Sequence, residues 1–364
     1  MALMVKIRGV GLSARIRPLQ TASGRALFCL LLLFVGASGA MAQERDVKPQ
    51  DGQSGFGTIK FSGLLQAWYS SGDAGFDDTF RIRRAELKFT GEALRQLNWT
   101  VMVDPAKLLS QNTNVNRARG ILQDGFITLS FHQRLNLNVG RFKVPLSLEG
   151  LQSSAGLDTE RALFISDRAR GGAYGDVRDI GVMAYGPLTD QLDYQIGFFD
   201  GSGDTRNELR NEQKAVAGRI SYRPTFLPGL QVGTSSVRGN ETTIERSRRD
   251  RLGADLLYLN GPVTLKTEYM TGKDGSLERK GYYAHFVYRL TPNVESILRY
   301  DTWDPDLSRE STAVSVTERD YIAGFNYFMH GSHVKLQFNY VRKTFEDDIV
   351  APFNLAVLRL QTFW

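Results

Sequence analysis

The stretch Val334-Lys-Leu-Gln-Phe-Asn-Tyr340 alternates strictly between apolar and polar side chains. Successive side chains of a β-strand point to opposite faces, so this stretch predicts a strand with one apolar and one polar face. The same period of two recurs over residues 97–104, 192–198 and 263–269. One face of each strand is therefore suited to lipid and the other to water.

Extending this pattern along the chain predicts sixteen strands. They cover about residues 57–70, 80–90, 95–104, 121–131, 135–144, 178–186, 191–200, 213–223, 230–237, 251–259, 262–271, 281–290, 294–303, 318–328, 333–343 and 353–364. Odd connections are predicted to be long, at about 9 to 33 residues, and even ones short, at about 2 to 6. Strict alternation of long and short connections is typical of transmembrane barrels, whereas strand alternation alone also fits a soluble sandwich.

The strands must close into a cylinder, because an open sheet edge in hydrocarbon leaves backbone groups without hydrogen-bond partners. An even number of strands returns both termini of the chain to the periplasm. The last stretch, Ala356-Val-Leu-Arg-Leu-Gln-Thr-Phe-Trp364, is an amphipathic strand ending on an aromatic residue, which is typical of an outer-membrane assembly signal. We therefore predict an all-β fold: a 16-stranded antiparallel transmembrane β-barrel over residues 57–364, in the bacterial outer membrane.

The N-terminal residues predict export. Five cations precede an apolar run over residues 26–35, and small residues follow at Ala40 and Ala42, so we expect a signal peptide over 1–42 and a polar periplasmic lead-in over 43–56. The single cysteine, Cys29, lies inside the apolar run. Removing the five cations leaves 40 Lys and Arg against 39 Asp and Glu, a net charge of +1, which removes the support for a nucleic-acid partner.

A sixteen-stranded lumen is too wide for wall side chains to fill, so a loop should narrow it. The third outer loop, residues 145–177, is the longest connection and too apolar for a disordered one. We expect it to fold into the barrel as a constriction loop. Several aromatic residues near strand ends are suited to interfacial girdles: Trp68, Tyr69, Tyr282, Tyr283, Tyr300, Trp303, Tyr321 and Tyr327.

The second strand is the richest in cations. With Leu87 and Phe89 facing lipid, Arg84 and Lys88 face the lumen. Arg81 and Arg83 then fall on the lipid side, unless they reach to the rim or a bulge shifts the pattern. Arg141 and Lys143 also fall on the lipid side of their strand, unless a bulge at the neighbouring Gly140 turns them toward the lumen. Further cations with lumen parity include Arg219 and Arg299. These charges either bind anions or form a salt-bridged wall.

Several short motifs, in order, resemble the phosphate-selective porin O and P family. They are Asn138-Val-Gly-Arg-Phe-Lys-Val-Pro-Leu-Ser-Leu-Glu-Gly-Leu151, Thr159-Glu-Arg161, Arg178-Asp-Ile-Gly-Val182, Ala217-Gly-Arg219 followed by Pro224, Leu298-Arg-Tyr-Asp-Thr-Trp303 and Leu358-Arg-Leu-Gln361. The resemblance implies a passive channel, trimeric and anion-preferring, with an infolded third loop. Its solutes would be small anions such as phosphate or polyphosphate, and its other partners outer-membrane lipid, lipopolysaccharide and the assembly machinery.

The residues expected to line the pore or bind anions are Arg84, Lys88, Lys143, Arg161, Arg168, Arg170, Arg219 and Arg299. Rings of Arg or Lys are how proteins build anion-selective pores. Two other barrel functions stay open: a general or sugar-type porin without anion specificity, and an adhesive or structural barrel that does not conduct. No serine, histidine or metal-ligand motif suggests catalysis, so we expect no enzyme activity, cofactor or metal.

Overall fold

The computed structural model describes residues 59–73, 78–109, 120–201, 214–241, 247–307, 312, 315–331, 333–346 and 349–364. The expected signal peptide (1–42) and polar lead-in (43–56) lie outside the described residues, so both stay predictions. Among the residues described, no helix is both long and apolar enough to cross a bilayer.

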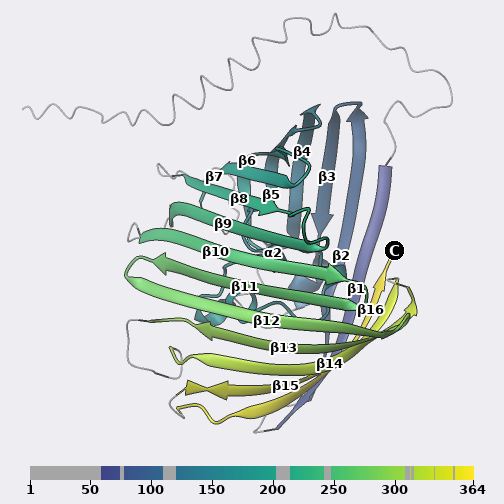
Figure 1. The fold of residues 1–364 in the computed structure, drawn as a ribbon, viewed down its shortest axis with the longest axis vertical. Coiled ribbons are helices and arrows are strands. Elements are labelled where there is room, and N and C mark those ends of the chain that lie inside the picture. The colour runs from purple at the N-terminus through teal and green to yellow at the C-terminus, as the bar shows by residue number, and fades with distance from the viewer. Residues whose placement is uncertain are drawn as a thin grey trace, which may run out of the picture. The chain divides into compact units, whose positions relative to one another are not determined.

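Sixteen antiparallel strands form one closed barrel in sequence order, with β1 paired to β16 (Figure 1). The strands are β1 (Ile59–Gly72), β2 (Thr79–Leu94), β3 (Leu97–Val103), β4 (Leu122–His132), β5 (Leu135–Lys143), β6 (Arg178–Pro187), β7 (Leu192–Phe199), β8 (Ala215–Tyr222), β9 (Leu230–Glu241), β10 (Ser247–Asn260), β11 (Val263–Asp274), β12 (Leu277–Thr291), β13 (Val294–Asp304), β14 (Glu318–His330), β15 (Val334–Phe345) and β16 (Phe353–Phe363). The predicted fold class and strand number are confirmed.

The predicted alternation of connection lengths is wrong at two outer connections, β9–β10 and β11–β12. About nine residues are expected between β11 and β12, but Asp274 pairs with Leu277, so the connection is a two-residue turn, 275–276. The β9–β10 hairpin also extends further than the pattern indicates, with Glu241 paired to Ser247. Where a strand continues beyond the hydrocarbon layer of the membrane, its backbone hydrogen bonds persist but its apolar and polar side chains no longer need to alternate. The hydrophobic periodicity therefore does not detect these strand ends.

The two faces of the wall differ as the alternation predicts. On β13 the outward Leu298 is 59% exposed, while its neighbour Arg299 is 4% exposed. On β16 the outward Leu360 is 49% exposed and Gln361 is fully buried. Apolar side chains thus cover the outer surface of the barrel, and polar side chains point into it.

The girdle interpretation is wrong for three aromatic residues. Trp68, Tyr283 and Trp303 are almost fully buried and lie on the inward faces of β1, β12 and β13. Tyr282 and Tyr321, in contrast, are exposed on the outer surface. A strand residue's distance from the strand end does not determine its face, so position alone misassigned the inward aromatics.

The seam between the first and last strands is held on both faces. On the inner face, Gln66 Nε2 donates to Gln361 Oε1 at 2.6 Å. At the strand ends, Gly63 N donates to the Trp364 carbonyl at 2.8 Å. A side chain at Gly63 would overlap the Trp364 indole, whose ring atoms come within 2.3 Å of an added Cβ position. The glycine therefore lets the C-terminal aromatic pack on the β1 backbone.

Candidate functional site

We call residues 144–177, which connect β5 and β6, the long segment. It contains four short helical turns: α2 (Leu148–Leu151), η3 (Ser154–Gly156), α3 (Leu163–Ser166) and η4 (Arg168–Arg170). Ser147 caps α2, its hydroxyl accepting from Gly150 N at 2.9 Å. Gly150 packs so closely on Gly175 that an added Cβ would lie 2.7 Å from the Gly175 Cα. The segment therefore folds back on itself.

One side of the long segment packs into a buried apolar core. Phe164 stacks on Tyr283 with ring centroids 6.0 Å apart, and Tyr174 meets Trp303 edge-on at 5.1 Å. The core consists of Phe142, Val144, Leu146, Ala162, Leu163, Phe164, Ile165, Tyr174, Met183, Phe199, Ala215, Ala217, Met270, Tyr283 and Trp303. Its wall residues belong to β5–β8 and β11–β13, so this core joins the segment to one side of the barrel.

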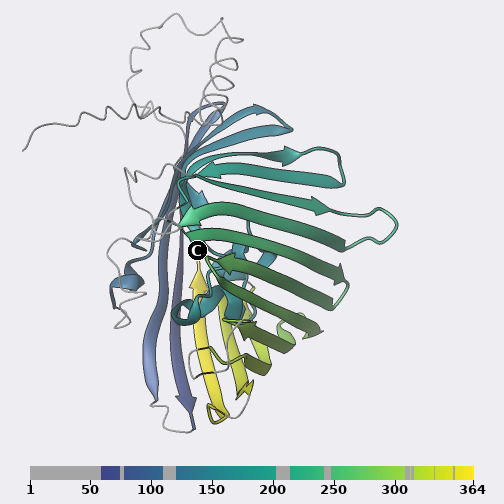
Figure 2. The same cartoon turned by 90° about the vertical axis from the view of Figure 1, so that its left-hand side faces the viewer.

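The segment also makes polar contacts with strands across the ring from β5 and β6. Glu149 Oε1 lies 2.7 Å from Arg299 Nη1 on β13. Asp158 Oδ2 accepts from Lys266 Nζ on β11 at 2.6 Å. The Leu157 carbonyl accepts from Lys335 Nζ on β15 at 2.9 Å. In two views the turns of the segment fall within the outline of the strands (Figure 2).

A β-bulge decides where the arginines of β2 point. Gln66 pairs with Arg84 but Ala67 pairs with Ile82, so Arg83 is an extra residue in the ladder. The bulge reverses the side-chain parity beyond it. Arg81 is therefore placed opposite the inward Trp68, with its Cζ 4.6 Å from the indole centroid. Of the two interpretations left open by the sequence, the bulge is the correct one.

The side chain of Glu160 joins the long segment to this arginine group. Its Oε1 lies 3.2 Å from Arg83 Nη2 and 3.0 Å from Arg84 Nη2. Arg359 Nη2 on β16 lies 3.9 Å from Glu160 Oε2. Glu160 and Arg83 each retain 28% side-chain exposure, whereas the Arg299 side chain on the opposite wall retains none. Water therefore reaches Glu160 and Arg83, whereas the Arg299 side chain is shielded from it.

A second carboxylate, Asp176, gathers the cations at the end of the long segment. Its oxygens lie 3.0 Å from Lys143 Nζ, 3.4 Å from Arg161 Nε and 3.2 Å from Arg178 Nη1. Arg178 also contacts Asp124 on β4 at 2.7 Å. Lys143 additionally donates to the Gly150 carbonyl at 2.7 Å. The β5 ladder passes Gly140 without a register shift, so Lys143 reaches the segment without the bulge considered there.

Electrostatics in the long segment favour ionised carboxylates. Burial opposes ionisation, but the Arg83, Arg84 and Arg359 guanidinium groups hold the pKa of Glu160 well below its usual value. Burial likewise acts against Asp176, yet Lys143, Arg161 and Arg178 keep its pKa well below the usual range. On η1 (Pro105–Leu109), burial and the charge of Arg178 lower the pKa of Lys107 to about 8.

The eight predicted site residues fall into distinct environments. Arg84, Lys143 and Arg161 meet around Glu160 and Asp176 as described. Arg168 donates to the carbonyls of Gly175 and Asp176 at 3.5 and 3.3 Å. The other four are distributed elsewhere: Arg170 pairs with Asp167 and Glu318, Arg219 with Asp255, Arg299 with Glu149 and Asp301, and Lys88 is exposed on β2.

Sequence reasoning missed Glu160 and Asp176 as the organising carboxylates and Trp68 as an inward residue. It also left Arg81 and Arg83 unassigned. The motif Thr159-Glu-Arg161 contained the signal for Glu160, because a carboxylate in an apolar segment facing a cationic strand needs a partner.

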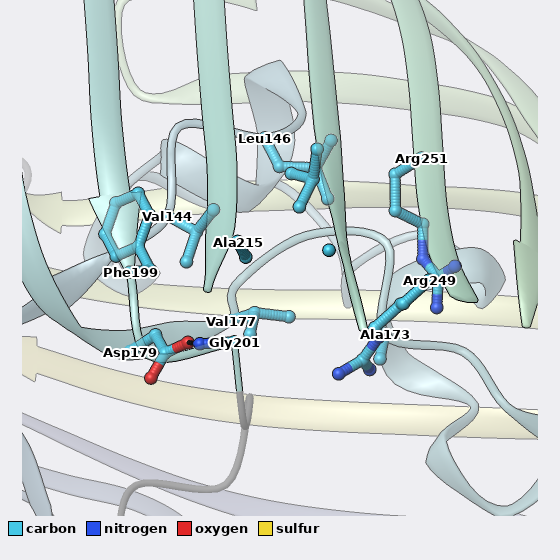
Figure 3. A pocket seen from close by; sticks show the side chains of 12 residues that line it. Val144, Leu146, Ala173, Val177, Asp179, Phe199, Gly201, Ala215, Arg249 and Arg251 are labelled. Atoms are coloured by element: carbon cyan, nitrogen blue, oxygen red, sulfur yellow. Dashed lines mark hydrogen bonds between the residues drawn. The ribbon is translucent and has the colours of Figure 1, made fainter. Parts of the chain in front are cut away.

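A small pocket of about 40 Å³ lies between the long segment and the β7–β10 wall (Figure 3). Apolar side chains such as Val144, Leu146 and Phe199 line one part of it, and Arg249 and Arg251 line another. Arg251 stacks on Tyr174 at 4.0 Å and pairs with Asp274 at 2.6 Å. The pocket has room for about one water molecule, so it is a packing gap and not a solute site.

In the described part of the chain, no group of three His, Cys, Asp or Glu side chains is arranged to hold a metal ion. His285, the one histidine with lumen parity, has its Nε2 3.2 Å from Asp158 Oδ2, and Asp158 also binds Lys266. This histidine therefore belongs to the contacts between segment and wall.

Solved porins share this fold. An anion-selective porin from Comamonas acidovorans aligns with a TM-score of 0.61 at 14% identity, covering 84% of this chain and 99% of that one. OmpF of Salmonella typhi, solved with daunomycin, gives 0.64 at 13%, covering 86% and 99%. The outer-membrane channel DcaP of Acinetobacter baumannii gives 0.59 at 13%, covering 86% and 99%. No curated protein sequence matches the chain.

The family model described as phosphate-selective porin O and P matches residues 68–237 and 231–363, nearly the whole barrel. The match includes β2, the long segment and the closing strand. Family and fold indicate an outer-membrane channel and not an enzyme. The chain therefore belongs to the phosphate-selective porin O and P family and is an outer-membrane porin.

Proposed function

We propose that this porin is a passive channel that prefers small anions, phosphate among them, and that the long segment is its constriction loop. The observation that carries the proposal is an excess of positive charge on the water-exposed side of the segment. Nine cations there interact with Glu160 or Asp176: Arg81, Arg83, Arg84, Lys107, Lys143, Arg161, Arg168, Arg178 and Arg359. We call this set the basic cluster.

Five carboxylates interact with the basic cluster: Glu86, Asp104, Asp124, Glu160 and Asp176. Nine cations minus five carboxylates leave a charge of +4 among the described residues. A cationic lining of this kind concentrates anions at the narrowest part of a pore and repels cations.

The opposite side of the segment is rich in carboxylates, with Glu149, Glu268 and Asp301 around Arg299. All four are nearly fully buried, Glu268 and Asp301 being 1% and 2% exposed. Acidic charge on that side is therefore covered by the long segment, whereas Arg81 and Arg83 of the basic cluster keep contact with water. This asymmetry supports anion preference even though the exported chain is expected to be nearly neutral.

Reversal potential in a salt gradient tests the proposal. Purified protein in a planar bilayer should conduct, and its zero-current potential should move toward the chloride equilibrium potential. Inorganic phosphate should reduce the chloride current by competing for the same cations. A zero-current potential on the cation side, or none in either direction, would remove the anion preference and leave the porin assignment intact.

We also propose a homotrimer, since one of the similar structures, OmpT of Vibrio cholerae, is described in a trimer form. Unheated detergent gels should then show a band at three times the monomer mass that heating converts to monomer. Lipopolysaccharide and the outer-membrane assembly machinery stay predicted partners of the barrel.

A further inference from the structure

A group of four arginines lies on the inner face of the β1, β2 and β16 wall, and three of them lie over the Trp68 ring, while Arg84 joins the group through Glu160. The Cζ atoms of Arg359, Arg81 and Arg83 lie 4.1, 4.6 and 5.7 Å from its ring centroid. A guanidinium over an indole is attracted by the π-system without being neutralised. The indole therefore holds these side chains in place and leaves their charge available.

The negative charge supplied to this group is small. Glu160 contacts Arg83, Arg84 and Arg359, and Glu86 reaches Arg84 alone, at 3.9 Å. No carboxylate among the described residues lies within 4 Å of the Arg81 guanidinium. Four guanidinium charges against two carboxylates leave an excess of two positive charges beside one buried aromatic ring.

Hydrogen-bond donors in this group also lack partners. Trp68 Nε1, Arg83 Nε and Arg359 Nε are buried and donate to no atom of the described residues, and Glu160 Oε2 accepts from none. Trp68 and Arg359 are 6% and 1% exposed. Buried N–H groups without acceptors are rare because leaving them unpaired is unfavourable. An oxyanion presents several acceptor lone pairs and would satisfy such donors together.

We propose that Trp68, Arg81, Arg83, Arg84 and Arg359 form one oxyanion-binding site, and that Glu160 is a tethered competitor for it. The proposal rests on the anion preference argued above. In the absence of solute, the Glu160 carboxylate occupies the arginines in place of an anion. A phosphate, sulfate or carboxylate ion displaces it, and its return helps release the ion, because conduction requires binding weak enough for exit.

Trp68 itself reports occupancy of the site. Iodide quenches indole fluorescence on collision, and the signal of Trp68 is the difference between wild type and Trp68→Phe. Phosphate bound at the site should protect Trp68 from iodide, with a measurable half-protecting concentration. In Glu160→Gln, which keeps the side-chain shape but removes the competing charge, that concentration should fall roughly tenfold.

Two further variants complete the design. Glu160→Asp keeps the charge but shortens the reach to the arginines, so its half-protecting concentration should fall between wild type and Glu160→Gln. Glu346→Gln removes one negative charge at the outer end of the barrel, where Glu346 pairs with Arg319 at 3.1 Å, and should leave the titration unchanged. Heat-modifiable migration on gels confirms that each variant folds.

The outcomes separate this proposal from the proposed function. No protection of Trp68 by phosphate, or equal half-protecting concentrations in wild type, Glu160→Gln and Glu160→Asp, would overturn the tethered-competitor site. If wild type also shows anion preference in its reversal potential, the proposed function survives that failure. If Glu160→Gln lowers the phosphate concentration that protects Trp68, the result supports the oxyanion-binding site. If the reversal potential of the same protein is cation-selective, that result counts against the proposed function alone.

Discussion

Arg299 on β13 and Glu149 in the long segment form a buried ion pair, with Nη1 and Oε1 2.7 Å apart, although the two residues are 150 positions apart in sequence. The same guanidinium lies 3.1 Å from Asp301 Oδ2. One arginine thus compensates two buried carboxylates and attaches the segment to the wall opposite its own ends.

Arg299→Gln should destabilise the folded barrel by about 3 to 5 kcal/mol, because it leaves buried carboxylates without compensation. Urea unfolding in detergent micelles measures the change. Arg289→Gln is a matched control on the neighbouring strand, since Arg289 pairs with Glu295 at 2.9 Å but is 57% exposed, and it should cost no more than about 1 kcal/mol. Equal losses in the two variants would contradict the structural role of the Arg299 pair.

Gly150→Ala should disturb the fold of the long segment, because an added Cβ would lie 2.7 Å from Asp176 N and Gly175 Cα. Overpacking of this kind costs about 1 to 3 kcal/mol. Gly156→Ala in the same segment is the control, since its nearest neighbour is the flexible Gln152 amide at 3.3 Å. Single-channel recordings should show increased current noise for the first variant only; quiet currents from both would argue against a constricting segment.

Acidification should leave the ion pairs of Glu160 and Asp176 intact until the pH falls below the usual carboxyl pKa of about 4. The pKa values of Glu160 and Asp176 are lowered in the fold, so the unfolded chain binds protons first. Their stabilising contribution is therefore complete above the ordinary pKa and is lost as the pH falls through the lowered values. Conductance measured from neutral to strongly acid pH checks this. A conductance transition on the neutral side of the ordinary carboxyl pKa that disappears in Glu160→Gln or Asp176→Asn would contradict the prediction.

Alkaline pH should weaken anion preference. Burial lowers the pKa of Lys107 to about 8, so this cation loses its proton near that pH and the basic cluster loses one charge. Reversal potentials should therefore shift toward zero as the pH rises through this value. In Lys107→Gln the shift should be smaller than in wild type, and an undiminished shift there would assign the titration to other cations.

Arg168→Gln should reduce the anion-to-cation permeability ratio by about twofold to fivefold, since one unit of charge is removed from the basic cluster. The double variant Arg219→Gln with Asp255→Asn is the control. It removes a buried pair whose atoms lie 2.5 Å apart and leaves the net charge unchanged. Reversal potential compares the two; an equal fall in both would show that selectivity does not follow the net charge of the basic cluster.

Much of the fold was predictable because the bilayer imposes one rule on every strand: side chains that face lipid are apolar, and those that face the lumen can be polar. Leu336, Phe338 and Tyr340 face outward and Lys335, Gln337 and Asn339 inward on β15, as their alternation indicates. That rule lapses outside the apolar zone, where Asp274 and Leu277 still pair. Periodicity therefore located all sixteen strands but shortened the outer hairpins.

The candidate site was only partly predictable because it depends on register. The length and apolar character of residues 145–177 marked the segment, but not its partners. Whether Arg81 faces inward depends on one extra residue at Arg83, and a bulge is defined by the pairing of two strands. The position of Glu160 among these arginines depends in turn on how the long segment folds. The sequence of β2 alone therefore could not predict the contact between Glu160 and the arginines.

The seam between β1 and β16 has a consequence for assembly kinetics. Gln66 and Gln361, hydrogen-bonded across it, are 295 residues apart, whereas every other pair of neighbouring strands is consecutive in sequence. Bringing distant residues together costs more chain entropy than forming a hairpin, so the hairpins should form before the ends join. Until that last step the nascent sheet has two unsatisfied edges, each a template for pairing with another chain. These edges stay open to such pairing until β1 and β16 join.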